Sequence, residues 1–349
     1  MTVKVPIEKK NVLVLGGAGF LGSHLCEFLL KKGDNIICLD SFVSSEVENI
    51  KMMLEFPNFE FIRHDITEVI NFETLPELRK FRIKAQGIQE IYNLACPTSP
   101  EDFTKLPIKT SLSNSIGVVN SLELARQYQA RYLFASSSAV YGDPPDKSEI
   151  INENYLGRVN FIGPRACYNE GKRFAETLVT TYGEHYKMDN RIARIFTTYG
   201  PRMKLMSGRQ VPDFIYNALT SRELEIKGDE KTGSSLCYVK DMVEGLVALM
   251  ASAEHQSVNL GGDKFFTYKE VADKIVSMTS SNSKVSFGDS IKYSHRQAVP
   301  DINFAKEKLG WFPLVSLEDG LRESIAYAQS NLVRLRGVGL DQPEESEDN

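Results

Sequence analysis

A short apolar run, a glycine-rich turn and a helical segment follow one another at the start of the chain. Residues 12–15 are typical of a buried parallel strand. Glycines stand at positions 16, 19 and 22, and a helical pattern then runs to Gly33. Glycines at this spacing permit a tight turn, close approach of a pyrophosphate and close packing of helix on strand. The helix N-terminus offers unpaired N–H groups to the anion, so the order predicts a dinucleotide-binding unit.

An acidic residue ends the second predicted strand. The strand is predicted at 35–39 and is apolar from Ile36 onwards, and Asp40 follows about twenty residues beyond the glycines, where an acid binds the ribose hydroxyls of adenosine. Residues 41–43 are Ser, Phe and Val, so no Arg or Lys is placed there to hold a 2′-phosphate. The pattern therefore predicts NAD rather than NADP as the cofactor.

Tyr168 and Lys172 stand four residues apart in a segment with helical periodicity, so they share one helix face. A nearby ammonium favours the phenolate, and we expect it to lower the pKa of the tyrosine. Such a phenol can take a proton from an alcohol at neutral pH. The spacing alone arises by chance on many helices, but together with the glycine loop and Asp40 it predicts a catalytic pair.

Strands and helices alternate through the first half of the chain. This alternation predicts the fold class: α/β, with a Rossmann-type doubly wound parallel sheet. Further strands are predicted at 59–66, 87–95, 131–135 and 190–196, and a helix at 108–128. Beyond residue 196, glycines and prolines divide the pattern into shorter pieces, typical of a smaller C-terminal substrate-binding α/β cap.

The predicted boundaries follow this change of pattern. We expect an NAD-binding domain at 1–196 with a contribution from about 235–262, a cap at 197–234 and 263–335, and an acidic, disordered tail at 336–349.

Bulk properties exclude several classes of protein. The 349 residues carry a net charge of −5, which provides no basic footprint for nucleic acid. No apolar run reaches the roughly eighteen residues of a membrane span, and the N-terminus lacks the apolar centre of a signal peptide. Five widely spaced cysteines without a CxxC pair favour reduced thiols and a cytoplasmic location. Five scattered histidines form no ligand pair, so no metal is expected.

With Ser137 after the fifth predicted strand, the chain resembles the extended short-chain dehydrogenase/reductase superfamily (NAD-dependent epimerase/dehydratase) from about residue 10 to 330. Within it, the sequence is most similar to the UDP-glucuronate decarboxylase (UDP-xylose synthase) family. The segments that carry this similarity are 96–100, 107–110, 141–144, 162–168, 196–203, 300–302 and 309–311.

The resemblance implies a first step on a nucleotide-sugar substrate. Tyr168 would take the proton of the sugar 4-hydroxyl, Lys172 would hold the phenolate and the nicotinamide ribose, and Ser137 would bond the reacting oxygen while hydride leaves C4 for NAD+. The expected cofactor contacts are Gly16, Gly19, Phe20, Leu21, Gly22, Asp40, Asp65, Ile66, Leu94 and Ala95, with Tyr168 and Lys172. The expected substrate contacts are Ser138, Arg165, Arg202, Arg209 and Arg296.

The resemblance also implies a homodimer, in which the helix after Pro107 and the helix with Tyr168 pair across a two-fold axis. The apolar positions that could supply the seam are Ile116, Val119, Leu122, Phe174 and Leu178, with Thr181.

Four positions depart from the decarboxylase pattern. Ala139 stands where the family has Glu, Ser234 where it has Arg, Thr197 where it has Asn, and Ala298 where it has Arg, with Arg296 two residues upstream as a substitute. A methyl at 139 moves no proton, so the chain is not expected to be a dehydratase. A serine at 234 lacks the charge and the bidentate fork suited to a carboxylate.

Three interpretations therefore stay open. The first is a UDP-glucuronate decarboxylase with a rearranged pocket, since a 4-keto sugar with a 5-carboxylate loses CO2 with little help. The second is a C4 epimerase or 4-dehydrogenase acting on another nucleotide sugar, favoured by Ala139 and Ser234. The third is a non-catalytic NAD-binding regulatory protein, against which the retention of Ser137, Tyr168 and Lys172 argues.

Overall fold

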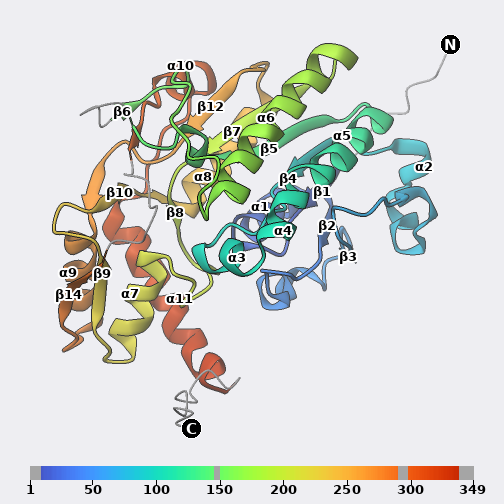
Figure 1. Cartoon of the computed structure of the whole chain (residues 1–349). Helices are drawn as coiled ribbons and strands as arrows, with labels where there is room; N and C mark the ends of the chain where they lie inside the picture. Colours follow the sequence, from blue (N-terminus) through green and yellow to red (C-terminus); the bar gives the residue numbers. More distant parts are fainter. Residues whose placement is uncertain (1–8, 145–149, 290–297, 338–349) are drawn as a thin grey trace, which may run out of the picture.

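A seven-stranded parallel sheet forms the centre of the computed structural model, which describes residues 9–144, 150–289 and 298–337. The strand order is β12-β7-β5-β4-β1-β2-β3 (Figure 1). The strands are β1 (Asn11–Leu15), β2 (Asn35–Asp40), β3 (Phe59–Arg63), β4 (Glu90–Asn93), β5 (Arg131–Ser137), β7 (Asn190–Ile195) and β12 (Ser257–Leu260). The order reverses between β1 and β4, and the carboxyl ends of two such strands border the crevice where ligands bind in open α/β sheets.

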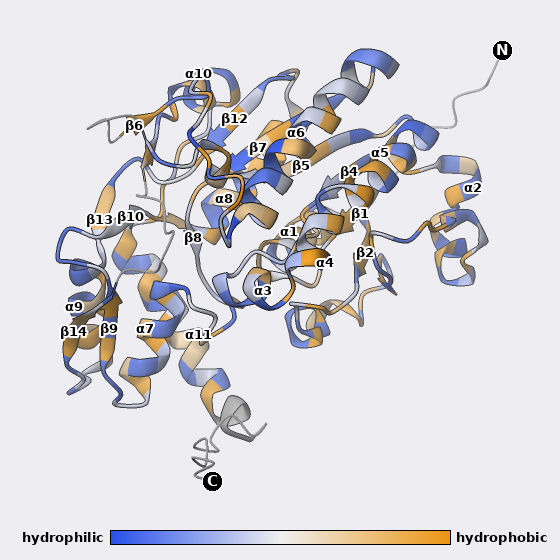
Figure 2. Cartoon of the chain, in the orientation of Figure 1, coloured by the Kyte–Doolittle hydropathy of each residue, from blue (hydrophilic) through white to orange (hydrophobic). Residues whose placement is uncertain are grey.

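Helices cover both faces of the sheet. Val12 and Val14 of β1 pack on one side in a cluster that includes Leu25 and Leu246, while Leu13 packs on the other with Val118. The helices involved are α1 (Phe20–Lys31) and α8 (Val239–Ala251) on the first side, and α5 (Ile116–Tyr128) and α6 (Ala166–Tyr186) on the second. Apolar residues accordingly colour the inner strands in Figure 2. The predicted doubly wound fold is confirmed.

The C-terminal part adds small sheets and helices beside the main sheet. Figure 1 shows α7, α9, β9 and β14 gathered together, with α11 passing beside them. These elements are α7 (Gln210–Leu219), β9 (Leu224–Lys227), α9 (Tyr268–Thr279), β14 (Val285–Gly288) and α11 (Leu317–Gly337). Shorter elements are β6 (Ile150–Ile151), β8 (Thr198–Tyr199), β10 (Gly233–Ser235), β11 (Cys237–Tyr238), β13 (Phe265–Thr267), β15 (Val299–Pro300) and α10 (Asn303–Leu309). The predicted acidic tail lies almost entirely outside the described residues.

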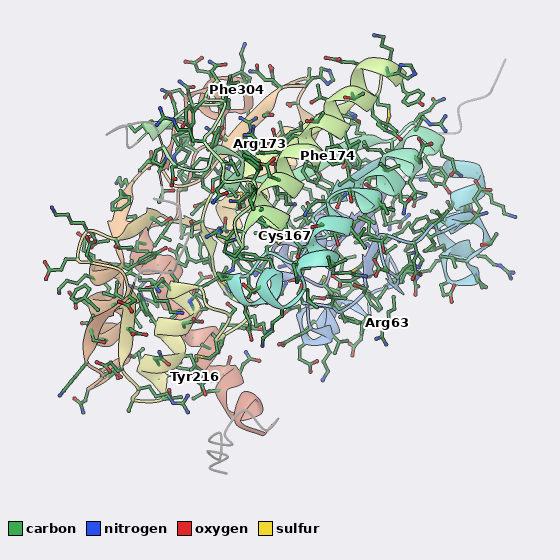
Figure 3. All side chains as sticks on the ribbon, viewed as in Figure 1. Arg63, Cys167, Arg173, Phe174, Tyr216 and Phe304 are labelled. Atoms are coloured by element: carbon green, nitrogen blue, oxygen red, sulfur yellow. The ribbon has the colours of Figure 1, made fainter. Side chains whose placement is uncertain are left out.

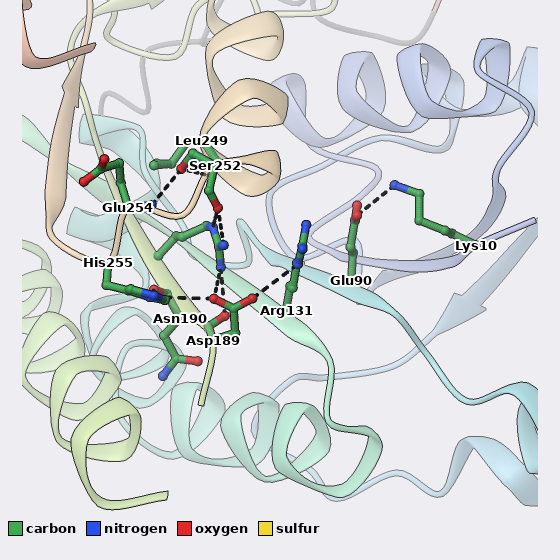
Figure 4. A network of polar contacts seen from close by, with 10 residues as sticks. Lys10, Glu90, Arg131, Asp189, Asn190, Leu249, Ser252, Glu254 and His255 are labelled. Atoms are coloured by element: carbon green, nitrogen blue, oxygen red, sulfur yellow. Dashed lines mark hydrogen bonds and ion pairs between the residues drawn. The ribbon is translucent and has the colours of Figure 1, made fainter. Parts of the chain in front are cut away.

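A polar network ties the strands together at their amino ends, away from the crevice. The guanidinium of Arg191 is buried and donates to the Ser252 carbonyl and to Asp189, whose carboxylate also pairs with Arg131 at 3.2 Å. Figure 4 shows these contacts, with His255 near the same carboxylate. Because a buried guanidinium needs such partners, the network stabilises the end of the sheet opposite the crevice. No helix within the described ranges is long and apolar enough to cross a membrane.

The single helix predicted at 108–128 is two helices, α4 (Pro107–Ser113) and α5. The break falls at Asn114 and Ser115, where ψ is 0° and −86°. Side chains compete for the carbonyls of the last turn: Asn114 Nδ2 donates to Thr110 O at 2.9 Å and Ser115 Oγ to Ser111 O at 2.8 Å. Such side-chain bonds offer the backbone an alternative to the helix.

Leu122 does not supply a dimer seam, and that part of the sequence prediction is wrong. Its side chain is fully buried in the core between α5 and the sheet. Ile116 and Phe174 are exposed to 49% and 51%, and Figure 3 marks Phe174 on α6. Apolar residues at helical spacing identify the apolar face of a helix, but they do not show whether that face packs in the core or against another subunit.

Leu122→Ala should lower the free energy of unfolding by about 2–5 kcal/mol, because it leaves a cavity in a packed core. Urea denaturation measures the change. Leu156→Ala is the control, since Leu156 is 86% exposed and its truncation should change stability by less than about 0.5 kcal/mol. Equal effects of the two changes would contradict the placement of Leu122.

Candidate active site

A cavity of about 250 Å³ opens at the carboxyl ends of β1, β4 and β5, at the reversal of strand order. Its lining includes Gly16, Gly19, Gly22, Tyr168 and Lys172. A second cavity of about 850 Å³ continues it towards the C-terminal part and shares Thr197 and Arg209 with it. The two lie between the main sheet and the small elements, a position typical of ligand sites.

The glycine turn packs so closely on neighbouring backbone that a side chain does not fit at two of its positions. Gly16 has φ +75°, and a Cβ there would lie 2.8 Å from the Ala95 nitrogen. A Cβ on Gly22 would lie 2.1 Å from the Gly16 carbonyl oxygen. Helix α1 begins at Phe20, with Gly19 as its N-cap and no side-chain cap, so Gly22 lies in its first turn. The predicted contacts Phe20 and Leu21 also line the cavity. The turn and the helix N-terminus therefore form a backbone cradle suited to a pyrophosphate.

Asp40 ends β2 beside this cradle. Its Oδ2 accepts a hydrogen bond from Ala18 N at 3.0 Å, and its Oδ1 accepts from Ser45 Oγ at 2.7 Å. A small cavity of about 70 Å³ adjoins it and is lined by Asp65, Ile66, Leu94 and Ala95, as the sequence predicts for the adenosine end. Lys109, which the sequence analysis did not select, lines the same cavity and pairs with Asp65.

Tyr168 and Lys172 lie on α6 against the end of β5. Lys172 is 3% exposed and its Nζ donates to Ala135 O at 2.8 Å. The ammonium also lies 4.6 Å from the Phe134 ring centroid and 5.9 Å from that of Tyr168. A hydrogen bond joins the side chains of Tyr168 and Ser137. The three residues predicted as catalytic therefore lie together, and their roles stay a prediction.

The expected lowering of the tyrosine pKa by Lys172 is not what the structure shows. Burial raises the pKa of Tyr168, Cys96 raises it further, and the hydrogen bond from Ser137 and the charges of Arg209 and Arg165 lower it. Burial likewise lowers the pKa of Lys172. Desolvation is the largest effect on both groups, and helical spacing alone does not reveal it.

Two further residues border Tyr168. The Phe103 ring stacks on the tyrosine ring with centroids 5.7 Å apart, and the Arg165 guanidinium lies 5.3 Å from the Phe103 centroid. Cys96 lines the cavity and accepts a hydrogen bond from Asn114 Nδ2. Phe103 belongs to α3 (Pro100–Lys105), whose capping Ser99 and first-turn Pro100 are the sequence signal that could have indicated it.

The predicted substrate residues have different surroundings. Arg209 lines both large cavities and donates to Thr98 O at 2.9 Å, whereas Arg202 is paired with Glu27 of α1. Arg165 lines the larger cavity. Ser138 begins the short 3-10 helix after β5 and lines neither large cavity. Arg296 lies outside the described residues.

Two departures from the decarboxylase pattern contact each other. Ser234 Oγ donates to Thr197 Oγ1 at 2.7 Å, and Ser234 is 1% exposed. The Tyr268 side chain also hydrogen-bonds Ser234. Ala298 is buried in a separate, apolar cluster with Val140 and Phe196. The residues that replace the family Asn and Arg therefore form a neutral, hydrogen-bonded set, in which Thr197 lines both large cavities and Ser234 lines neither. Within the described residues, no group of three His, Cys, Asp or Glu could hold a metal ion.

Comparison with known proteins adds family information. The model of the family described as GDP-mannose 4,6 dehydratase matches residues 13–324. UDP-glucuronic acid decarboxylase 4 of Arabidopsis thaliana is 42% identical over 322 residues, which is 91% of this chain and 69% of that protein.

Solved structures are similar over nearly the whole fold. UDP-glucose 4-epimerase of Thermotoga maritima, solved with UDP-glucose, has a TM-score of 0.80 at 26% identity and covers 92% of this chain and 99% of its own. UDP-glucuronic acid 4-epimerase of Bacillus cereus, in complex with UDP-glucuronic acid and NAD, has a TM-score of 0.78 at 26% identity, with the same two coverages.

The loop with Arg202 rests on α1 through His24, whose ring nitrogen lies 2.9 Å from Pro201 O. Burial and the charge of Arg202 lower the pKa of His24 from 6.5 to about 4. Protonation thus favours the unfolded chain, so this contribution to stability is complete above pH 6.5 and is lost as pH falls towards 4. Because one pKa unit is about 1.4 kcal/mol, the loss amounts to at most about 3.5 kcal/mol.

His24→Gln retains a donor towards Pro201 but does not titrate. The free energy of unfolding of both proteins is measured with urea from about pH 7 to about pH 4, a range that includes the roughly 6.5 reference pKa of histidine. It should decline less steeply for the variant than for the unaltered protein. Parallel declines would contradict a buried, neutral His24.

Proposed function

The chain belongs to the GDP-mannose 4,6-dehydratase family of NAD-dependent nucleotide-sugar enzymes, and we propose that it oxidises C4 of a nucleotide sugar. The observation that carries this proposal is that Tyr168 and the buried Lys172 line one cavity with the glycine cradle, with Ser137 beside the phenol. In this cavity, a base for an alcohol proton lies next to a dinucleotide site.

The cofactor is NAD, and the residues present fit it. The cradle suits a pyrophosphate, because Gly16, Gly19 and Gly22 line the cavity where α1 begins. Asp40 is placed to bind the adenosine ribose. When bound, NAD+ supplies a hydride acceptor for the sugar carbon.

The protein groups supply proton transfer and orientation. Tyr168 takes the proton of the 4-hydroxyl, and Ser137 donates a hydrogen bond to the same oxygen. Lys172 lies beside the phenol on the same helix face, and its charge offsets part of the cost that burial places on the phenolate. Phe103 and the end of β5 hold the phenol between them, so the geometry is set before a substrate enters.

The first candidate for the complete reaction is decarboxylation of UDP-glucuronate. Sequence identity of 42% to a UDP-glucuronic acid decarboxylase supports it. Arg165 and Arg209 line the cavity that continues from Tyr168 and supply positive charge for an acidic nucleotide sugar. Once C4 is a ketone, loss of CO2 from the neighbouring carboxylate needs no acid at position 139.

The second candidate is a C4 epimerase or 4-dehydrogenase acting on a nucleotide sugar without a carboxylate. The Ser234–Thr197 hydrogen bond favours it, because two hydroxyls replace the charged family arginine and its asparagine neighbour. Loss of a charged hydrogen-bonding partner costs about 1.5–3 kcal/mol, up to roughly a hundredfold in affinity.

Product analysis by mass spectrometry tests these candidates against UDP-glucuronate and neutral UDP-, GDP-, CDP- and dTDP-sugars. UDP-xylose with CO2 establishes the decarboxylase, and an epimer or a 4-keto sugar establishes the second candidate. Tyr168→Phe should lower turnover at least about a hundredfold while NAD affinity changes less than about twofold, since the phenol acts in the chemical step. Cofactor binding by the unaltered protein without any turnover would instead indicate a regulatory role.

We also propose a homodimer and a cytoplasmic location. The exposed apolar side chains of Ile108, Leu112, Ile116 and Phe174 on α4, α5 and α6 support the dimer. The five cysteines, none in a disulfide, support a reducing compartment.

Sedimentation velocity tests the dimer with Phe174→Asp, which places a charge in the proposed seam. The unaltered chain should sediment as a dimer at micromolar concentration and the variant should dissociate at least about tenfold more readily, because an unpaired charge is costly in an interface. Leu314→Asp is the control and should leave the dimer intact, because Leu314 is 71% exposed and its backbone contacts Asp241 of α8 on the other face of the sheet. A monomeric unaltered chain would refute the proposal.

A further inference from the structure

Three successive residues at the end of β5 are each held by one face of α6. Lys172 donates to the carbonyl of Ala135, and Tyr168 hydrogen-bonds Ser137. Between them, Ser136 Oγ donates to Glu176 Oε1 at 2.6 Å. Positions 168, 172 and 176 are successive members of an i, i+4 row, so a single helix face makes all three contacts. The first two contacts belong to the proposed chemistry, whereas Glu176 lies outside the cavity lining.

Glu176 is itself held by Arg194 of the neighbouring strand. Arg194 Nη2 lies 2.7 Å from Glu176 Oε2, and its Nε lies 3.0 Å from Oε1. Ser136 and Arg194 are register partners on β5 and β7, so the carboxylate sits above a strand pair and bonds to both members. The side chains of Arg194 and Glu176 are only 15% and 12% exposed. A two-pronged bond of this kind fixes direction as well as distance.

The far side of Arg194 is also occupied. Its Nη1 donates to the Tyr141 hydroxyl at 3.0 Å and to Glu153 O at 3.0 Å. The guanidinium lies 4.9 Å from the Tyr141 ring centroid. All three nitrogens of the guanidinium therefore have hydrogen-bond partners, which leaves Arg194 little freedom to follow a movement of α6.

We propose that Ser136, Glu176 and Arg194 are positioning residues that set the rotation and height of α6 on β5, and so hold the Tyr168 hydroxyl at Ser137. The effect on turnover rests on the proposed function, whereas the effect on the helix does not. A displacement of about 1 Å at a reacting group can cost about a hundredfold in rate, so a fixed helix register has direct chemical value. Lys172 cannot supply that register alone, because its four-carbon side chain is flexible.

The same carboxylate acts on the charge of Lys172. Burial lowers the pKa of Lys172, while Cys96 and Glu176 raise it. Tyr168 faces the ammonium from the same helix, and Arg194 lies on the far side of Glu176. Replacing Glu176 by a neutral amide should therefore lower the pKa of Lys172, and the ammonium should be lost at a lower pH than in the unaltered protein.

Glu176→Gln keeps the shape of the side chain and removes its charge, and Ser136→Ala removes one hydrogen bond. Glu170→Gln is the matched control, because Glu170 lies on the same helix and contacts Arg173 near the surface at 3.6 Å. Turnover number, KM, NAD affinity and melting temperature are measured for each variant, and the turnover number is followed with pH.

We expect Glu176→Gln to lower the turnover number about tenfold or more while KM and NAD affinity change less than about threefold, as for a loss confined to the chemical step. The alkaline limb of its pH profile should move to lower pH. Ser136→Ala should lower the turnover number in the same direction by a smaller factor, and Glu170→Gln should match the unaltered protein. A lowered melting temperature with unchanged turnover and an unmoved alkaline limb would overturn the proposal.

Hydrogen–deuterium exchange separates this proposal from the proposed function, because it needs no substrate. Amides of residues 166–172 should exchange faster in Glu176→Gln and Ser136→Ala than in Glu170→Gln. Unchanged exchange in both variants would refute the positioning role even if the enzyme turns over. Faster exchange in a chain that oxidises no nucleotide sugar would support the helix contact and refute the proposed function.

Discussion

An ammonium group in the protein interior is the feature around which the site is organised. Lys172 is almost fully buried, and an unpaired charge in such a place is strongly unfavourable. The Ala135 carbonyl, two aromatic rings and the carboxylate of Glu176 offset this cost from several directions. The carbonyl and one ring come from β5, and the other ring and the carboxylate come from α6. The charge is therefore tolerated only when the helix packs on the sheet in one register.

The phenol of Tyr168 lies among groups that have opposite effects on its pKa. Burial alone disfavours the phenolate, and the structure without ligands shows that effect. Ser137, Arg165 and Arg209 counteract it from β5, from the residue before α6, and from the loop before α7. A bound cofactor with a positively charged ring would add to these groups, which is why binding and proton transfer are coupled in such a site.

Two departures from the decarboxylase pattern lie together beside the two large cavities. Thr197 and Ser234 are distant in sequence but form one hydrogen-bonded pair, so their two departures from the decarboxylase pattern make a single alteration. The alteration is neutral and buried, and it leaves the Ser137–Tyr168–Lys172 group and the glycine cradle in place. Family membership therefore constrains the chemistry at C4 of the sugar more closely than it constrains which group the sugar carries at C5.

The sequence determined what depends on local spacing: the glycine turn, Asp40 at a strand end, the helical pair Tyr168 and Lys172, and the alternation that makes a doubly wound sheet. Those features follow from backbone geometry, which neighbouring residues control. Tertiary packing alone decided that Leu122 is core, that the helix breaks at Asn114, that burial raises the pKa of Tyr168, and that Glu176 meets Ser136 and Arg194. These outcomes depend on desolvation and on partners far away in sequence, and both exist only once the sheet and its helices have packed together.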